Sequence, residues 1–360
     1  MPHFQCLPSR SFLILLAGLS GLAQAQVSPD LKECLGLPQD SARLACYDRL
    51  AGREAMVTLP ASPAAPEGSV PQPATQAAVP ATTQQSDDSF MSRYWELNAA
   101  DKRGTFNYTS YRPNFFMPLH EMQSVNRRPH SPTRGTANTL PKYQNGETKV
   151  QVSMRSKVLE DVFLPGADLW VAYTQQSMWQ LWNHDQSAPF RNTDYQPEVT
   201  YVVPTPASWQ SLPLGWRWRM SQLGFEHQSN GQTDPLSRSW NRFYAGVGLE
   251  RSNWMLNLRL EQRLKTDSKV GDDNPDIQDY LGRSEIQLAW MPGRATTSVA
   301  WRPSLSGKGS VLLDYSYPVF RDRPDGLRWY AQLFQGYGET LLDYNFKQTS
   351  LSLGLTIFKF

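Results

Sequence analysis

The chain has 360 residues, a formal net charge of +2 and a mean hydropathy of −0.52. The near-neutral charge and the lack of a basic stripe give no argument for nucleic-acid binding, and the absence of a long apolar run excludes a helical membrane span. Aromatic residues make up 12% of the sequence, including 12 Trp and 15 Tyr, which is typical of transmembrane β-barrels with aromatic girdles at both interfaces.

Residues 1–25 have the pattern of a signal peptide. Arg10 supplies the positive region, Ser11 to Leu22 form a short apolar core, and Ala23-Gln24-Ala25 supplies the small residues of a cleavage site. The apolar core is too short to span a bilayer. The mature chain is therefore predicted to be exported into an oxidising compartment.

Residues 26–54 form a predicted small module around two cysteines. Cys6 leaves with the signal peptide, so Cys34 and Cys46 remain as an even pair flanked by two short helical turns. Export favours a disulfide between them. A metal site is the alternative, although two cysteines without a nearby histidine are too few. The sequence predicts no function for this module.

Residues 55–90 form a predicted linker. This stretch is rich in Pro, Ala, Gln, Thr and Ser, with prolines spread from Pro60 to Pro80. Closely spaced prolines exclude a packed helix or sheet. A disordered or partly polyproline-like segment is therefore expected.

Residues 91–360 are predicted to form an all-β domain, a 12-stranded antiparallel transmembrane β-barrel. Apolar alternation is clean at Val150, Val152 and Met154, and turn signals such as Asn145-Gly146 and Asp325-Gly326 separate the strands. A barrel must close because an open edge in hydrocarbon leaves backbone groups unpaired. The expected strands cover roughly 105–118, 147–158, 167–182, 194–206, 215–229, 239–250, 253–264, 277–290, 295–304, 309–319, 327–336 and 344–358.

Three irregularities interrupt this pattern. The alternation changes parity before Leu223, which predicts a bulge near Ser221. Residues 116–144 are poorly periodic and are predicted to be a loop. The last strand alternates on odd positions, whereas the terminal Phe360 is even, which departs from the usual C-terminal pattern of such barrels.

The hairpin from Leu223 to Leu249 carries the candidate chemistry. Alternation on both sides of its turn predicts two antiparallel strands, and a hairpin symmetric about Asp234 places His227 directly opposite Asn241. Their Cβ atoms are then roughly 5 Å apart. Ser229 lies about 6.6 Å from His227 along the same face, at a rise of ~3.3 Å per residue.

These three side chains suit nucleophilic catalysis. Ser229 needs a base to take its proton, His227 is that base, and Asn241 can orient the imidazole as the third member of a triad does. Two residues beyond the serine, Gly231 can offer its backbone N–H to an oxyanion. His-x-Ser pairs are common by chance, but this trio interrupts an apolar face that meets lipid, where polar groups are costly and usually functional.

The block from His227 to Asn241 closely resembles the signature of the outer-membrane phospholipase A family. Other stretches match the family in the same order: YTQQSMWQLWN (Tyr173 to Asn183), SAPFRNTDYQPE (Ser187 to Glu198), DDNPDI (Asp272 to Ile277) and GYGETLLDYNFKQT (Gly336 to Thr349). The resemblance covers about residues 105–360. It implies a serine hydrolase of the Gram-negative outer membrane that cleaves acyl esters of glycerophospholipids, with phospholipase A1, A2 and lysophospholipase activity. The N-terminal module, which the resemblance does not cover, is expected to lie in the periplasm.

The resemblance also implies a calcium ion. Its ligands map onto the carbonyl oxygens of Ser187 and Gln232 and the hydroxyl of Ser237, and oxygen ligands suit this hard cation. Gln232 stands where the family usually has Arg, but only its carbonyl is implicated. Three carboxylates are rival ligands, namely Asp185, Asp194 and Asp234.

Activation by homodimerisation is the third implication. Gln175 shares an apolar face with its neighbours and matches the family's interfacial glutamine, which hydrogen-bonds across the subunit boundary. A glutamine that is merely tolerated near the membrane interface is the alternative.

Other readings remain open from the residues alone. A non-catalytic barrel, either a small porin or a structural protein, would leave the trio without a role, and an esterase of soluble esters would need the trio in an aqueous cleft. A soluble β-sandwich or lipocalin-like barrel fits the alternation but not such long, aromatic-rich strands. A narrow 12-stranded interior can instead be filled by ion pairs from inward positions, for which the candidates are Arg155, Arg217, Arg219, Glu226, Arg242 and Arg259.

Overall fold

The computed structural model describes residues 34, 36–37, 39–50, 89–138, 140–188, 190–265 and 271–357. The chain divides into two compact units, Met1–Ala81 and Thr82–Phe360. The predicted signal peptide, residues 55–88 of the predicted linker and the terminal Phe360 lie outside the described residues.

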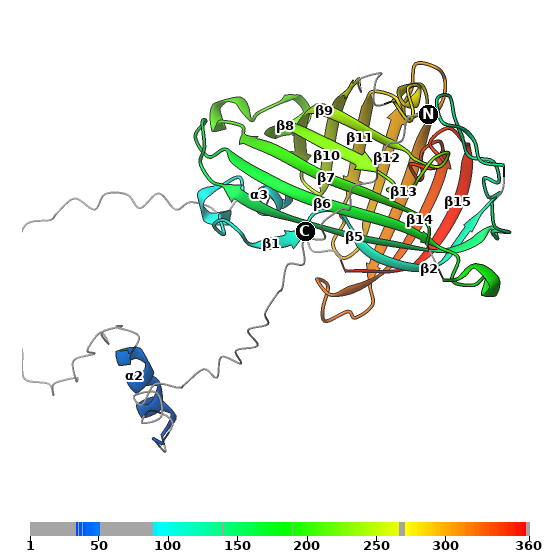
Figure 1. Cartoon of the computed structure of the whole chain (residues 1–360). Coiled ribbons are helices and arrows are strands. Elements are labelled where there is room, and N and C mark those ends of the chain that lie inside the picture. The colour runs from blue at the N-terminus through cyan, green and yellow to red at the C-terminus, as the bar shows by residue number, and fades with distance from the viewer. Residues whose placement is uncertain are drawn as a thin grey trace, which may run out of the picture. The chain divides into compact units, whose positions relative to one another are not determined.

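The first unit contains the short helix α2 (Asp40–Leu50), which is labelled in Figure 1. It also contains a disulfide. Cys34 and Cys46 are joined with their Cα atoms 5.6 Å apart. This confirms the predicted disulfide, which leaves neither thiol available as a metal ligand.

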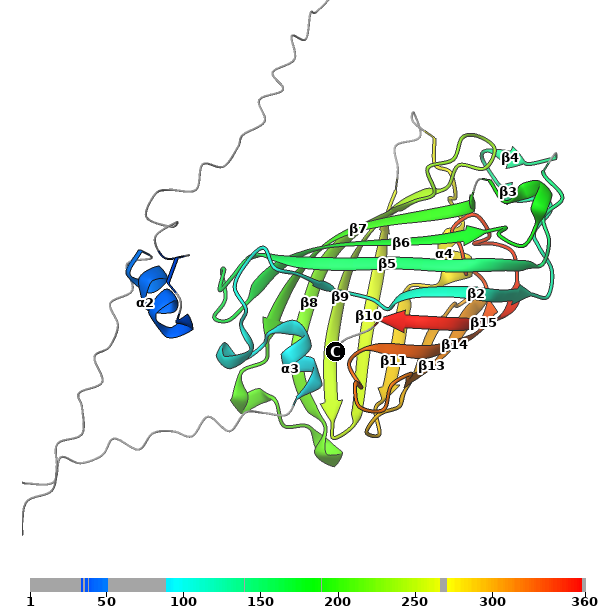
Figure 2. The same cartoon turned by 90° about the horizontal axis from the view of Figure 1, so that it is seen from below.

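Twelve antiparallel strands close into a barrel in the second unit (Figures 1 and 2). Each strand pairs with the next along the chain from β5 to β15, and β2 closes the ring between β15 and β5. This confirms the predicted 12-stranded barrel. Its strands are β2 (Asn114–Met122), β5 (Gly146–Leu159), β6 (Asp168–Trp179), β7 (Phe190–Pro204), β8 (Arg217–Ser229), β9 (Ser239–Arg251), β10 (Trp254–Leu264), β11 (Ser284–Trp290), β12 (Thr296–Pro303), β13 (Gly309–Pro318), β14 (Leu327–Gly336) and β15 (Gln348–Ile357).

Shorter elements complete the unit. The strand β1 (Tyr108–Ser110) pairs with β5 beyond the end of β2, and β3 (His130–Ser131) pairs with β4 (Gly135–Thr136) in a separate hairpin. Among the described residues, no helix has the length and apolar character needed to cross a membrane. The helical elements are α3 (Phe90–Trp95), α4 (Ile277–Leu281) and the 3₁₀ turns η1 (Ala99–Asp101), η2 (His184–Gln186), η3 (Ala207–Trp209) and η4 (Pro213–Gly215).

Side-chain alternation divides the barrel wall into two faces. In β9, Arg242 and Tyr244 are buried inside, whereas Phe243 between them is 52% exposed on the outside. The same period of two gives the other strands an apolar exterior and a polar interior. The outer face is therefore suited to lipid, and the inner face must satisfy its own charges.

Two irregular strands differ in how well the sequence predicted them. The expected bulge in β8 is present, because the pairing with β9 slips between Trp218 and Met220. In contrast, β2 continues to Met122, so the predicted loop starting at residue 116 begins too early. The pairing of β2 with β5 slips between Met117 and His120, which breaks the alternation on which the prediction rested.

The region before β11 was also predicted wrongly. Residues 277–283 were expected to be strand, but Ile277–Leu281 form α4, and β11 begins only at Ser284. Ile277 and Leu281 are four residues apart and both buried, which is helical spacing, and Gly282 follows with φ +75°. A short apolar run does not by itself distinguish a strand from one helical turn.

Both ends of the barrel are filled by side chains. At one end α3 packs Met91 and Trp95 against Trp170, Val202 and Met220. Toward the other end, Leu341 and Tyr344 of the β14–β15 loop pack with α4 and Trp240. Figure 2 shows α3 at one end of the barrel and α4 toward the other.

Ion pairs line the space between these two ends, around a cavity of about 370 Å³. Glu226 is 0% exposed, Arg242 is 1% exposed, and Arg155 and Arg219 are buried as predicted. Arg259 also faces inward, with its guanidinium 2.6 Å from Glu226. Arg217, the first residue of β8, pairs with the buried Glu250 on the inner face but is itself exposed, so it lies at the end of the barrel rather than among the interior ion pairs.

Candidate active site

The hairpin of β8 and β9 brings the three candidate catalytic residues onto one outward face. His227 pairs with Asn241, and Ser229 pairs with Ser239, which is the register expected for a hairpin symmetric about Asp234. Leu223, on the same face of β8, is 60% exposed. The site therefore lies on the outer wall of the barrel.

His227 and Asn241 are in direct contact. The imidazole Nδ1 lies 2.8 Å from Asn241 Oδ1, so Nδ1–H donates to the amide oxygen and Nε2 is left as the basic nitrogen. Ser229 stands two residues along the same face, but no hydrogen bond joins its hydroxyl to His227 in the described structure. Catalytic hydrogen bonds are often looser before substrate binds.

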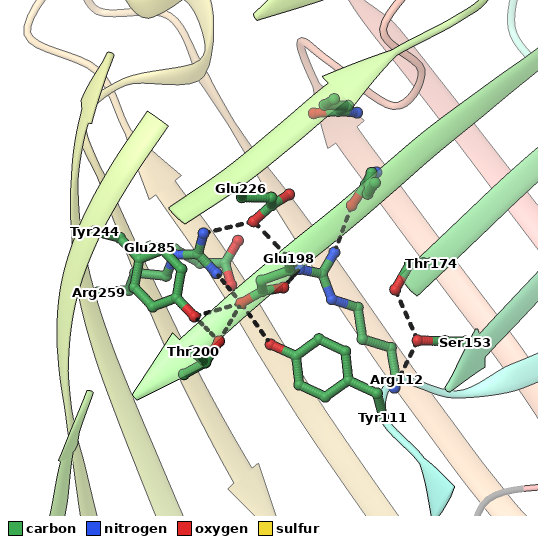
Figure 3. Close-up of polar contacts among 12 residues, drawn as sticks. Tyr111, Arg112, Ser153, Thr174, Glu198, Thr200, Glu226, Tyr244, Arg259 and Glu285 are labelled. Carbon is green, nitrogen blue, oxygen red and sulfur yellow. Dashed lines mark hydrogen bonds and ion pairs between the residues drawn. The ribbon is translucent and has the colours of Figure 1, made fainter. Parts of the chain in front are cut away.

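A buried ion pair stands directly behind the His227–Asn241 pair. Glu226 and Arg242 are the neighbouring cross-strand pair, and their side chains form a salt bridge inside the barrel. The Arg259 guanidinium lies between Glu226, at 2.6 Å, and Glu198, at 3.7 Å (Figure 3). These contacts fix the β8–β9 backbone from the inner side, while the site occupies the outer side.

Gly231 adopts a backbone conformation that suits glycine. Its φ is +62°, and a Cβ on this residue would lie 3.2 Å from the ring of Tyr195. Its N–H donates to no group among the described residues. Tyr195 faces outward between β6 and β8, opposite both Gln175 and Ser229. Sequence reasoning missed this tyrosine, although it lies within the SAPFRNTDYQPE match.

The loop after β8 is braced by Asn230. Its Oδ1 accepts from the backbone N–H of Arg238 at 2.9 Å and of Gln232 at 3.3 Å, and its Nδ2 donates to the Leu236 carbonyl at 2.8 Å. Asn230 is only 4% exposed. This side chain sets the path of the segment that presents both Gly231 and Gln232.

The loop that precedes β11 supports the same segment. Asp273 accepts from the hydroxyls of Ser237 at 2.8 Å and Ser239 at 3.1 Å, and Asn274 Oδ1 accepts from Ser239 N–H at 3.0 Å. Arg134 of the β2–β5 loop pairs with Asp273 at 2.7 Å, and this hydrogen bond raises the pKa of Arg134 above its usual value. The DDNPDI match thus contains residues that position the site, which sequence reasoning did not assign.

The three candidate calcium ligands come from two loops. Gln232 and Ser237 lie in the β8–β9 loop, whereas Ser187 lies in the β6–β7 loop, directly after η2. The Gln232 side chain reaches to Asn192 Oδ1 at 3.2 Å, and its carbonyl accepts no hydrogen bond from the described residues. Two of the three candidate ligands thus belong to one loop, and the third comes from a different loop.

The chemistry of these oxygens fits a calcium ion. Ser237 gives its proton to Asp273, which leaves the lone pairs of its hydroxyl oxygen for a cation and places a carboxylate behind it. The Ser187 carbonyl accepts one hydrogen bond, from Trp179 at 2.7 Å. Within the described residues, no group of three or more His, Cys, Asp or Glu side chains could hold a metal ion.

The rival carboxylates occupy different surroundings. Asp194 is 2% exposed inside the barrel and is bonded to Asn192 Nδ2 at 2.8 Å and to Leu341 N–H at 2.7 Å. The Asp185 side chain is 89% exposed, and that of Asp234 is 60% exposed and pairs with Arg134 at 3.3 Å. Asp194 is the one directed away from the outer face.

Gln175 faces outward from β6, as predicted. Its Oε1 accepts from the Tyr173 hydroxyl at 3.1 Å, and it is half-buried between Val152 of β5 and Tyr195 of β7. Because Tyr195 also pairs with Ser229, the glutamine and the serine are separated by a single strand. A second barrel resting on this face would therefore contact the site.

Comparisons with known proteins agree with this geometry. The family model of phospholipase A1 matches residues 91–357. A protein of Neisseria meningitidis serogroup B named "Putative phospholipase A1" is 37% identical over 367 residues, which is 95% of this chain and 94% of that protein. Phospholipase A1 of Escherichia coli strain K12 is 36% identical over 214 residues, which is 59% of this chain and 69% of that protein.

Solved structures show the same likeness. Outer membrane phospholipase A from Escherichia coli superposes with a TM-score of 0.62 at 29% identity, covering 72% of this chain and 94% of that chain. The Salmonella typhi outer membrane phospholipase dimer with bound calcium gives a TM-score of 0.64 at 29% identity, covering 75% of this chain and 98% of that chain.

Proposed function

The chain belongs to the phospholipase A1 family and is a β-barrel of the Gram-negative outer membrane, and from this we propose that it is a calcium-dependent serine hydrolase activated by homodimerisation. Its substrates are the acyl esters of glycerophospholipids, at either position and in lysophospholipids. The observation that carries the proposal is the pairing of His227 with Asn241 on the outer wall, with Ser229 on the same face.

The outward position selects a membrane substrate. A phospholipid in the bilayer can bring its ester to the barrel wall without entering the lumen, whose ends are filled by side chains. An esterase for soluble substrates would need a site open to water, and a porin would need an open lumen. The position on the wall therefore supports lipid hydrolysis over both alternatives.

The chemistry follows from the three side chains. His227 Nε2 takes the Ser229 proton as Oγ attacks the acyl carbonyl, and Asn241 Oδ1 stabilises the imidazolium through Nδ1–H. The Gly231 N–H would donate to the oxyanion of the tetrahedral intermediate. His227 then returns the proton to the departing glycerol oxygen, which leaves an acyl-serine. Water, deprotonated by His227, hydrolyses this ester to fatty acid and restores Ser229.

Calcium would be held by the carbonyls of Ser187 and Gln232 and by the Ser237 hydroxyl, with Asp273 behind the hydroxyl. The bound ion supplies positive charge near the developing oxyanion. Dimerisation through the face that carries Gln175 would shield Gln175 and the polar side chains of the active site from lipid, and would complete the site. The calcium-bound dimer of the Salmonella typhi relative supports both features.

Fatty-acid release from phospholipid mixed micelles tests the function. The wild-type chain should release fatty acid with calcium and lose that activity when calcium is chelated. Ser229→Ala should reduce turnover by at least about a thousandfold, since the nucleophile is gone. Substrates with different labelled acyl chains at the two glycerol positions would distinguish A1 from A2 activity. Turnover retained by folded Ser229→Ala would reject the assignment.

A further inference from the structure

The β6–β7 loop is held at its base by a bulge in β7. Met178 pairs with Asn192, but Trp179 pairs with Phe190, so Arg191 is an extra residue on β7. Arg191 turns inward and is fixed by Glu147 at 2.6 Å and by Asp343 at 3.0 Å. The bulge sends Trp179 and Phe190 outward together, with ring centroids 5.6 Å apart at an interplanar angle of 63°.

Trp179 reaches back over its own loop. Its indole Nε1–H donates to the Ser187 carbonyl at 2.7 Å, and this carbonyl accepts from no other group among the described residues. A carbonyl oxygen has two lone pairs. The indole uses one of them and leaves the other for a cation.

Loop carbonyls are poor ligands unless their direction is fixed, because the loop must be ordered when the ion binds. Ser187 follows directly after η2, a single 3₁₀ turn, whose residues His184 and Asp185 have almost fully exposed side chains. These side chains give the loop little packing. The indole hydrogen bond is therefore a main constraint on the direction of the Ser187 carbonyl.

We propose that Trp179 is a positioning residue of the calcium site, which holds the Ser187 carbonyl in the direction needed for coordination. This inference rests on the proposed function, in which that carbonyl is a calcium ligand. Among the described residues, the side-chain hydrogen bond of Trp179 goes to Ser187 and not to His227, Ser229 or Asn241. Its effect is on calcium affinity, and through it on calcium-dependent dimer formation.

The same loop provides a matched control. Trp182 is 56% exposed, and its indole Nε1–H also donates to a backbone carbonyl, that of Pro118 at 2.6 Å. The Pro118 carbonyl belongs to β2 and has no proposed role in calcium binding. Trp182→Phe thus removes an equivalent bond from the same loop without touching Ser187.

The experiment measures calcium binding by the full chain in detergent micelles, by titration calorimetry, and dimer formation by sedimentation across a calcium series. Trp179→Phe keeps the ring contact with Phe190 and loses the N–H. The half-saturating calcium concentration should rise about three- to tenfold, the effect of one lost hydrogen bond. Trp182→Phe should bind calcium as the wild type does, and the calcium-free melting temperature of both variants should match that of the wild type.

Trp179→His is a second variant, which distinguishes loss of the N–H donor in Trp179→Phe from a failure of that variant to fold. Its imidazole Nε2 is separated from the backbone by the same number of bonds as the indole Nε1, so it should restore most of the lost affinity. Equal shifts in Trp179→Phe and Trp182→Phe, or no shift in Trp179→Phe while the wild type binds calcium, would overturn the inference and leave the proposed function standing. A wild-type chain that releases fatty acid without binding calcium would instead refute the proposed calcium site, while the proposed lipid hydrolysis would stand.

Discussion

The imidazole Nδ1–H of His227 donates to the neutral side-chain amide of Asn241. The face on which they lie otherwise carries apolar side chains such as Leu223 and Phe243. A carboxylate in the place of Asn241 would bring a charge close to hydrocarbon, where desolvation is expensive. The amide oxygen still accepts from Nδ1–H, so the tautomer is fixed at a lower cost. A neutral third residue would therefore suit the proposed active site, which lies on the apolar outer wall.

Asn241→Ala should therefore lower kcat by about 10- to 100-fold, because His227 loses the acceptor that orients it and stabilises its charged form. Asn241→Asp keeps an acceptor at the same place and should retain more activity than the alanine variant. Phe243→Leu, the next outward position on β9, is the control and should behave as the wild type. Fatty-acid release from mixed micelles measures the effect, and equal activity in Asn241→Ala and Phe243→Leu would contradict it.

Single elements show where sequence reasoning succeeds. The pairing of His227 with Asn241 follows from strand parity and a symmetric turn, both of which are local properties. The outward position of Gln175 follows from parity in the same way. Residues with this kind of periodic signal could be placed without coordinates.

Contacts between loops carry no such signal. Ser237 and Asp273 are 36 residues apart in separate loops, and nothing in their spacing indicates the 2.8 Å hydrogen bond between them. Trp179 lies within the YTQQSMWQLWN match, but its bond to Ser187 depends on the bulge at Arg191, which the sequence pattern does not indicate. The helix α4 was missed because a five-residue apolar pattern fits a strand equally well.

At the element scale, the β8–β9 loop depends on Asn230. Asn230→Ala should lower kcat by about tenfold, because the segment with Gly231 and Gln232 loses three hydrogen bonds, while the barrel strands keep their pairing. The melting temperature should change little. Ser304→Ala is the control, since it removes the three hydrogen bonds of a hydroxyl in the exposed β12–β13 loop, at 2.7, 3.0 and 3.3 Å. A large loss of barrel stability in Asn230→Ala, with no change in kcat, would contradict this role.

Across the whole barrel, apolar side chains lie outside and charged side chains lie inside, which is the reverse of their distribution in a water-soluble domain. Large apolar side chains cover the outside, while Glu198, Glu226, Arg242 and Arg259 are paired inside the barrel. The site on the outer wall is therefore backed by a rigid ionic layer rather than by an apolar core. Apolar packing is concentrated at the ends, where α3 and the β14–β15 loop fill the barrel.

This arrangement makes α3 a main apolar anchor of the barrel, and Trp95 its central side chain. Trp95 is 6% exposed, packs edge-on against Trp170 at 5.9 Å, and lies 4.2 Å from the buried guanidinium of Arg155. Trp95→Ala should lower the free energy of unfolding by about 3–5 kcal/mol, because it leaves a cavity and removes a cation–π contact. Denaturant unfolding of the barrel in detergent measures the change. Arg93→Ala, exposed on the same helix, should change it by less than about 1 kcal/mol. Equal stability in the two variants would show that α3 only rests at the end of the barrel, and that the strand pairs and the inner ion pairs alone hold it closed.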